Sequence, residues 1–252
     1  MFNLKKHYFD GIDEQGNVFI IYDTTLKIGG IPIPYASLIV HQNGQTVESR
    51  RLNHLNWSEN RIHHTKLGFA GSWQPLEQLP PLTLFQRNKH KLIWHCHTAK
   101  ADFRLNFNQR NYRGLGYAET LEMNFTPWSL PIDELRWGRF LSANHSLIWI
   151  EWRGELPLKK LLWNGKLIEE FDIDDDKLFI KEHNLSLFFY QPVIVKDEPL
   201  ANITEQFKFL RFLIPAKFLH TRETKWKSEA GLTLNNQLET GFALYETVLW
   251  KK

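Results

Sequence analysis

The stretch from Gly114 to Gly154, GLGYAETLEMNFTPWSLPIDELRWGRFLSANHSLIWIEWRG, contains the pattern on which the fold prediction depends. In its first part Tyr117, Glu119 and Leu121 share one face, because successive side chains of a strand point to opposite sides. This strand ends at Pro127, since proline cannot donate a hydrogen bond to a neighbouring strand. Two more strand-like runs follow, at 135–142 and 147–153. The stretch therefore predicts consecutive β-strands.

The rest of the chain shows the same organisation. Short apolar runs alternate with turn sequences, and Asn43-Gly44 and Asn164-Gly165 are strong hairpin turns. The segment 203–213 is compatible with either a helix or a strand. There is no long amphipathic helix and no glycine-rich phosphate loop after a strand. With 42% hydrophobic and 14% aromatic residues, the chain is predicted to form an all-β barrel or sandwich with a large core or a lined cavity.

Charge and cysteine content exclude several classes of protein. The net charge is only +3 among 252 residues, and no block of five like charges occurs, so no nucleic-acid partner is expected. Cys96 is alone, the start of the chain lacks a signal peptide, and no run approaches the ~18 apolar residues of a membrane span. We therefore expect a cytoplasmic protein without a membrane span. The acidic run from Asp172 to Asp176 is interpreted as a solvated turn, with calcium binding as the alternative.

A weak internal repeat indicates two related halves. GYAET at Gly116 and GFALYET at Gly241 both place Glu-Thr in an apolar strand, and Glu119 and Glu246 are 246 − 119 = 127 residues apart. This distance is close to half the chain, which predicts two barrels in tandem, residues 1–124 and 125–252.

Glu119 and Glu246 are each the one acid among apolar neighbours on a strand face. Burial among apolar groups favours the neutral form of a carboxyl, and a buried neutral carboxyl is suited to act as a general acid. The alternative is that each glutamate pairs with a structural arginine, namely Arg136, Arg139 or Arg153.

Several short matches carry a resemblance to a known family. These are Tyr8-Phe9-Asp10-Gly11, Gly116-Tyr117-Ala118-Glu119, Trp137-Gly138 and the region of Trp149. With them the sequence resembles the carotenoid 1,2-hydratase (hydroxyneurosporene synthase) and AttH-like group. Its fold is two tandem lipocalin-like barrels, related to that of tocopherol cyclase and certain fungal Diels–Alderases. The resemblance implies this all-β fold.

The sequence also departs from the family pattern. The chain is shorter than a typical hydratase of the group, and His7 stands where the family has a tryptophan pair. After Glu119 the chain has Thr-Leu-Glu instead of an aromatic or cationic stretch. These departures leave the substrate open.

The resemblance implies a cofactor-independent enzyme for a lipophilic, isoprenoid or polyketide-like molecule. The reaction would be an acid-assisted hydration, cyclisation or isomerisation, which makes the chain a possible hydratase or cyclase. Glu119 would be the acid, Arg139 would orient a polar end of the ligand and Glu246 would contact it. Aromatic side chains would stabilise a cation; they are Tyr117, Trp128, Trp137, Trp149 and Trp152. The alternatives are a non-catalytic binder or carrier of a hydrophobic ligand, and a structural or partner-binding protein whose barrels are filled. For each tryptophan, the alternative is a place in the core.

The segment His95-Cys96-His97 is a second candidate centre. His95 and His97 share a strand face, which is metal-ligand geometry if a third ligand is added. That ligand could be His54, His63 or His64, but no spacing selects one, so no metal is predicted. Cys96 shares a face with Trp94 and is expected to be a buried small residue rather than a nucleophile.

Overall fold

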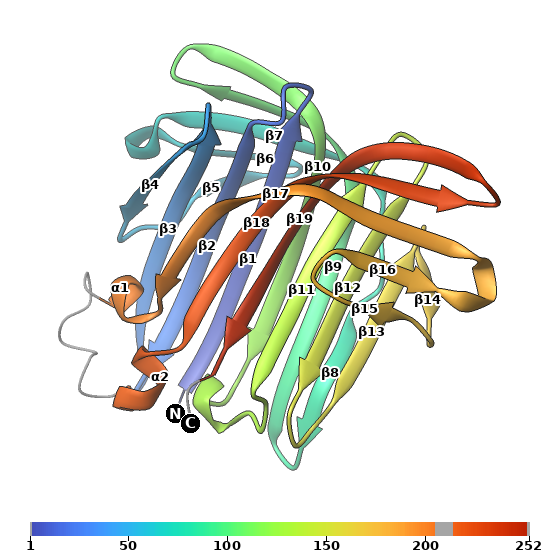
Figure 1. The fold of residues 1–252 in the computed structure, drawn as a ribbon. Coiled ribbons are helices and arrows are strands. Elements are labelled where there is room, and N and C mark those ends of the chain that lie inside the picture. The colour runs from blue at the N-terminus through green and yellow to red at the C-terminus, as the bar shows by residue number, and fades with distance from the viewer. Residues whose placement is uncertain (1, 205–213, 251–252) are drawn as a thin grey trace. The chain divides into compact units, whose positions relative to one another are not determined.

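The computed structural model of the chain describes residues 2–204 and 214–250. Nearly all of its regular structure is antiparallel β-strand, so the all-β prediction is confirmed (Figure 1). The chain forms two compact units, Met1–Pro127 and Trp128–Lys252. Most of the segment 203–213, whose structure the sequence left open, lies outside the described residues. No helix among the described residues has the length and apolarity needed to cross a membrane.

Unit 1 is an up-and-down meander. Its strands are β1 (Phe2–Asp13), β2 (Val18–Ile28), β3 (Ile31–Gln42), β4 (Gln45–Arg51), β5 (Asn56–Ser58), β6 (Arg61–His64), β7 (Phe69–Glu77), β8 (Leu82–Arg87), β9 (His90–Phe107) and β10 (Arg110–Met123). The order in the sheet is β4-β3-β2-β1-β10-β9-β7-β6-β5, with β8 paired to β9. The last strand thus returns to pair with the first, as in an up-and-down barrel. Figure 1 shows β1, β2 and β3 side by side in blue.

Unit 2 repeats this topology. Its strands are β11 (Glu134–Leu141), β12 (Ser146–Arg153), β13 (Leu158–Trp163), β14 (Lys166–Ile168), β15 (Asp172–Ile173), β16 (Lys177–Ile180), β17 (Leu185–Pro199), β18 (Arg222–Leu234) and β19 (Gln237–Leu249). Short helices α1 (Ala201–Thr204) and α2 (Ala216–Leu219) lie between β17 and β18. The order is β14-β13-β12-β11-β19-β18-β17-β16-β15. The prediction of two tandem lipocalin-like units is therefore confirmed.

Tight turns with a positive φ explain several of the hairpins. Asn43 and Gly44 have φ of 51° and 73°, and Asn164 and Gly165 have φ of 46° and 76°. Asparagine followed by glycine is the preferred pair where both central residues of a hairpin turn need a positive φ. Both predicted turns are confirmed.

The register shows which side chains face each core. In unit 1, Phe9 is opposite Ala118, and both belong to the core cluster. Tyr8 is opposite Glu119, so Glu119 lies on the other face of the same sheet. In unit 2, Phe140 pairs with Ala243 in the core cluster. Each sheet thus has one face toward its own core and a second face that carries most of the predicted site residues.

Candidate functional site

The carboxyl group of Glu119 is buried on β10 and is held by two neutral donors. Glu119 is 6% exposed. Its Oε2 accepts a hydrogen bond from the Tyr117 hydroxyl at 2.7 Å and another from the indole Nε1 of Trp94. Within the described residues, no arginine or lysine forms an ion pair with Glu119. The carboxyl is therefore held by uncharged hydrogen-bond donors.

The two donors leave the other carboxyl oxygen available. Oε1 of Glu119 has no hydrogen-bond partner among the residues that the structure describes. Tyr117 and Trp94 both direct their donors at Oε2, an arrangement that can stabilise negative charge there. The two oxygens of the Glu119 carboxyl group thus have different surroundings.

Tyr117 remains a hydrogen-bond donor because it stays neutral. Burial raises the pKa of the Tyr117 hydroxyl well above its usual value, and the nearby Cys96 and Glu119 add to this shift. Burial also raises the pKa of the Cys96 thiol well above its usual value, which a hydrogen bond with Tyr117 partly opposes. Cys96 is fully buried. A neutral buried thiol is a poor nucleophile, so Cys96 has the properties of a packed small residue.

Trp94 was not predicted as a partner of Glu119, and bulges in β9 explain why. The β9–β10 register shifts between Gly116 and Ala118 and again between Ala118 and Thr120. A bulge inserts an extra residue into one strand and redirects its side chains. Sequence alternation places Trp94 on a strand face, but it does not say which residue of β10 lies opposite. The indole contact could be found only from the three-dimensional register.

The remaining predicted residues belong to unit 2, and most share the face opposite its core. Trp137 is paired with Glu246 across β11 and β19, and Arg139 follows on the same face. Arg139 is fully buried and donates from Nη1 to the backbone oxygen of Phe242 at 3.2 Å. Trp152 is 4% exposed and lies on this face as well. The structure therefore groups Trp137, Arg139, Trp152 and Glu246.

Trp149 and Trp128 lie apart from that group. Trp149 belongs to the core cluster of unit 2, where its ring is 5.7 Å from that of Phe189. Trp128 lies in a short 3-10 turn, Pro127–Ser129, with its ring 5.4 Å from that of Phe218. Trp149 therefore lies in the core, which is the alternative that the sequence left open for each tryptophan. The predicted aromatic wall is thus divided among different surroundings.

Glu246 pairs with a lysine that the sequence did not indicate. Its carboxylate contacts the ammonium of Lys225, which is 3% exposed and also contacts Glu223 at 3.0 Å. A neighbouring cation stabilises the ionised form of a carboxyl. Glu246 is therefore unsuited to donate a proton, and its partner is Lys225 rather than one of the three arginines considered.

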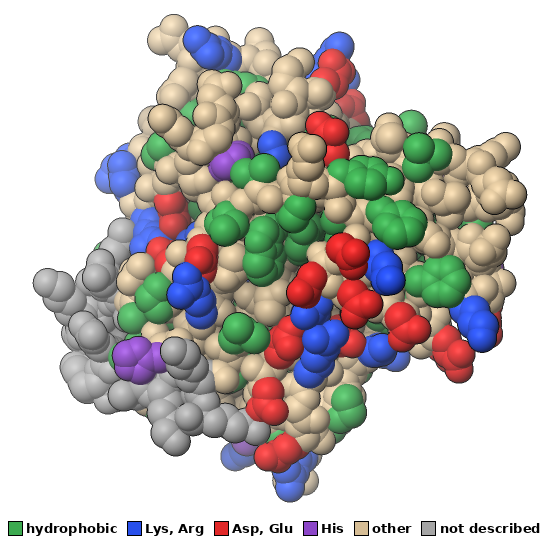
Figure 2. Space-filling view, viewed as in Figure 1, with side chains coloured by type: hydrophobic (Ala, Val, Ile, Leu, Met, Phe, Trp, Pro, Cys, Tyr) green, Lys and Arg blue, Asp and Glu red, His purple; other side chains and the backbone are tan. Residues whose placement is uncertain are grey.

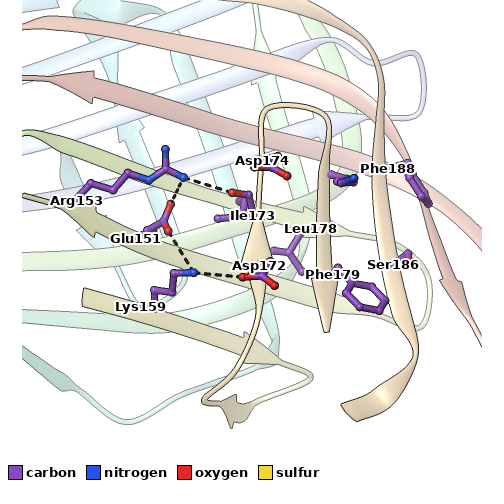
Figure 3. A pocket seen from close by; sticks show the side chains of 11 residues that line it. Glu151, Arg153, Lys159, Asp172, Ile173, Asp174, Leu178, Phe179, Ser186 and Phe188 are labelled. Carbon is purple, nitrogen blue, oxygen red and sulfur yellow. Dashed lines mark hydrogen bonds and ion pairs between the residues drawn. The ribbon is translucent and has the colours of Figure 1, made fainter. Parts of the chain in front are cut away.

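Unit 2 also contains a charged pocket of about 630 Å³ (Figure 3). Its lining includes a connected series in which Glu151 contacts Arg153 at 2.8 Å and Lys159 at 3.5 Å, and Lys159 contacts Asp172 at 3.6 Å. Glu151 is 4% exposed. The rest of the lining is Ile173, Asp174, Lys177, Leu178, Phe179, Ser186 and Phe188. These charges compensate one another inside the pocket.

Acidic and basic side chains are interleaved on the visible face over β11, β12, β15 and β16 (Figure 2). In the run from Asp172 to Asp176, the side chains of Asp172 and Asp175 are 89% and 91% exposed. Within residues 2–204 and 214–250, no group of three or more His, Cys, Asp or Glu side chains has the arrangement of a metal site. Asp172 begins β15 and Asp175 lies between β15 and β16, and both carboxylates are solvated.

Removing the charge of Glu151 is expected to destabilise unit 2. Glu151→Gln leaves Arg153 and Lys159 without their buried partner, and both can reach water only in part. We expect the free energy of unfolding to fall by about 1–3 kcal/mol, measured by urea denaturation. Asp172→Asn is the matched control, because this exposed carboxylate contributes under about 0.5 kcal/mol to its pair with Lys159. Equal effects of the two substitutions would contradict the buried network.

His97 makes stability depend on pH in the acid range. The pKa of His97 is lowered from 6.5 to about 4, first by burial and then by the nearby His95 and His7, against a hydrogen bond with the backbone of Glu119. As the pH falls from about 6.5 to 4, the unfolded chain binds a proton that the folded chain does not, so stability is lost in this window.

We expect this loss to be about 1–2 kcal/mol between pH 7 and pH 4.5. Urea denaturation at the two pH values measures it, and an NMR titration of the histidine rings gives the pKa directly. His97→Gln should reduce the difference, whereas His63→Gln, at an exposed position on β6, should leave it unchanged. A titration of His97 near 6.5 would show that the ring is not desolvated.

The fold and the surroundings of Glu119 together define the class of protein. The chain is an all-β protein of two tandem lipocalin-like units, and its buried carboxyl group on β10 is bound by tyrosine and tryptophan. No protein-family model matches the sequence, and comparison with curated proteins finds no significant match.

Solved structures with similar folds were found at low sequence identity. CghA in complex with Sch210972 is 10% identical, with a TM-score of 0.59 over 99% of this chain and 89% of that one. An AttH-type protein from Nitrosomonas europaea is 11% identical, with a TM-score of 0.53 over 100% and 94%. Kievitone hydratase from Nectria haematococca is 7% identical, with a TM-score of 0.53 over 98% and 89%. The chain therefore has the tandem fold of the AttH-like group, as the resemblance implied.

Proposed function

We propose that this chain is a cofactor-independent enzyme that acts on a lipophilic small molecule, with Glu119 as the proton donor. The observation that carries the proposal is the set of contacts around the Glu119 carboxyl group. It is 6% exposed, Oε2 is bound by Tyr117 and Trp94, and no ion pair with it occurs among the described residues. In this proposal the carboxyl group carries a proton at rest, and the donors on Oε2 stabilise the charge that forms when the proton leaves.

The proposed step is the protonation of a carbon–carbon double bond. The O–H bond at Glu119 Oε1 breaks, a C–H bond forms on one carbon, and a cation remains on the other. Tyr117 and Trp94 stabilise the carboxylate that is left. The cation is then captured by water in a hydration, captured by an internal hydroxyl in a cyclisation, or loses a different proton in an isomerisation. The proton released in that last stage restores the acid.

The fold supports a lipophilic ligand. Lipocalin-like barrels hold small apolar molecules in their interiors or mouths. The structures of similar fold include a hydratase and a protein bound to a small molecule. For this chain, hydration, cyclisation and isomerisation remain the three proposed outcomes, because each begins with the same proton transfer.

Native mass spectrometry of the protein purified from its own host tests this proposal. Any bound molecule is extracted, identified and returned to the ligand-free protein. An unsaturated lipophilic molecule that the protein converts would support the enzyme. A lipophilic molecule that binds tightly and is recovered unchanged, with no related molecule converted, would instead identify a carrier.

A further inference from the structure

A row of polar side chains crosses the core-facing side of unit 1, on the face opposite Glu119. The register places Asp23 of β2 opposite His7 of β1, His7 opposite Thr120 of β10, and Thr120 opposite His95 of β9. His7 Nδ1 and Thr120 Oγ1 are 2.8 Å apart. The next row along the same face begins the apolar core with Phe9. Polar groups thus border one end of the core, which is where barrels hold ligands.

Asp23 and His54 form a close pair at this border. His54 Nδ1 is 2.7 Å from Asp23 Oδ1, and the indole Nε1 of Trp57 donates to Asp23 Oδ2 at 2.8 Å. Asp23 is 4% exposed, whereas the His54 side chain is 49% exposed. The carboxylate therefore holds the imidazole with its Nδ1–H directed inward, so that Nε2 carries the free electron pair.

Nε2 of His54 is positioned to accept a proton. Its one partner within the described part of the chain is Thr25 Oγ1, at a long distance of 3.4 Å. An imidazole that is oriented by a buried carboxylate and open at its second nitrogen has the arrangement of a general base. Burial lowers the pKa of His7, so this neighbour stays neutral and does not oppose a positive charge on His54.

Trp57 supplies an aromatic surface beside this base. Its side chain lies 4.8 Å from the ring of His7 and 4.9 Å from that of Phe9, measured between centroids. The residue is nevertheless 41% exposed. A partly exposed indole next to a base is suited to a flat aromatic ligand, because aromatic rings pair favourably at such distances.

We propose that Asp23 and His54 form a general-base dyad that binds an aromatic molecule with an acidic hydroxyl group and holds it as the phenolate. The hydroxyl O–H bond breaks and an N–H bond forms at His54 Nε2. The imidazolium that results is paired with the Asp23 carboxylate, and its new N–H donates to the phenolate oxygen. The ligand ring packs against Trp57. This site does not depend on the role of Glu119, which lies on the other face of the sheet.

The coloured phenolate of p-nitrophenol provides the test. The probe is mixed with increasing amounts of the full chain at a pH one unit below the pKa of the p-nitrophenol hydroxyl. The phenolate absorbance is recorded. We expect the protein to raise the phenolate fraction in a saturable manner. His54→Gln should weaken phenolate binding about tenfold or more, because a charge-assisted hydrogen bond is lost. His63→Gln, at an exposed position nearby on β6, should behave like the original protein.

The variant Asp23→Asn tests whether Asp23 supports proton transfer to His54 or makes only a structural contact with it. It preserves the shape at position 23 but removes the charge that pairs with the imidazolium, so we expect the phenolate signal to fall while circular dichroism stays unchanged. If this variant does not fold, His54→Gln alone tests the proposal, because the side chain of His54 is half exposed. An unchanged signal in His54→Gln, or no phenolate signal from the original protein up to the solubility of the probe, would overturn the proposal.

Discussion

Replacement of Gly138 by alanine is expected to lower the free energy of unfolding by about 3 kcal/mol. A Cβ atom at this position would overlap the indole ring of Trp149 and would lie 2.5 Å from Cβ of Tyr245. Trp149 is 1% exposed and packs against Phe189 in the core of unit 2. The ring therefore has no room to move away, and the strain must be taken up by β11 and its neighbours.

Gly231→Ala is the matched control for this prediction. Its Cβ would meet the hydroxyl of Tyr190 at 2.7 Å and Cδ1 of Leu238 at 2.9 Å. Both of these residues are largely exposed, at 46% and 61%, so their side chains can rotate away. We expect a change of under about 1 kcal/mol, since alanine also restricts the unfolded chain. Urea denaturation of both variants measures the difference, and equal losses would mean that Trp149 does not pack on Gly138.

Glu119→Gln is expected to lower turnover by about 10²–10⁴-fold while leaving ligand binding nearly unchanged. The amide oxygen can accept the hydrogen bonds of Tyr117 and Trp94 in place of Oε2. The amide has no acidic proton, however, so the protonation step is lost. The loss should appear in kcat, because the substitution removes an interaction made only in the transition state.

Two further variants show whether the effect comes from the acid itself. Glu122→Gln changes a carboxylate on the same strand that is about half exposed and pairs with Lys5 at 2.8 Å, and it should leave turnover unchanged. Tyr117→Phe removes one of the two donors to Oε2, and we expect about a tenfold loss. Turnover that survives in Glu119→Gln would exclude this residue as the proton donor.

Sequence periodicity predicted the local geometry of the Glu119 site but not its surroundings. Alternation correctly places Tyr117 beside Glu119 on one face of β10, where the two form a hydrogen bond. It does not reveal which face meets the core, because β10 is buried on both sides from Gly116 to Thr120. The core-facing residue is Ala118, a small side chain with no distinguishing signal. The position of Glu119 therefore required the packed structure.

Long-range pairing accounts for the other differences. Lys225 reaches Glu246 because β18 and β19 are neighbours, whereas Arg136 and Arg153 have acidic partners of their own in Glu134 and Glu151. Trp149 and Trp152 are three residues apart, which puts them on opposite faces of β12 and divides the predicted aromatic wall. The His54–Asp23 contact joins residues 31 positions apart. Such contacts are set by strand register, which a single sequence specifies only weakly.

The most direct test of proton donation by Glu119 is turnover of the extracted ligand in D₂O. Protonation of a double bond by an acid in exchange with solvent places one deuterium on a carbon atom of the product. We expect the original protein to give a product with one carbon-bound deuterium, and Glu119→Gln to give almost no product. A product formed at the normal rate without carbon-bound deuterium would show that the reaction does not begin with a proton from Glu119.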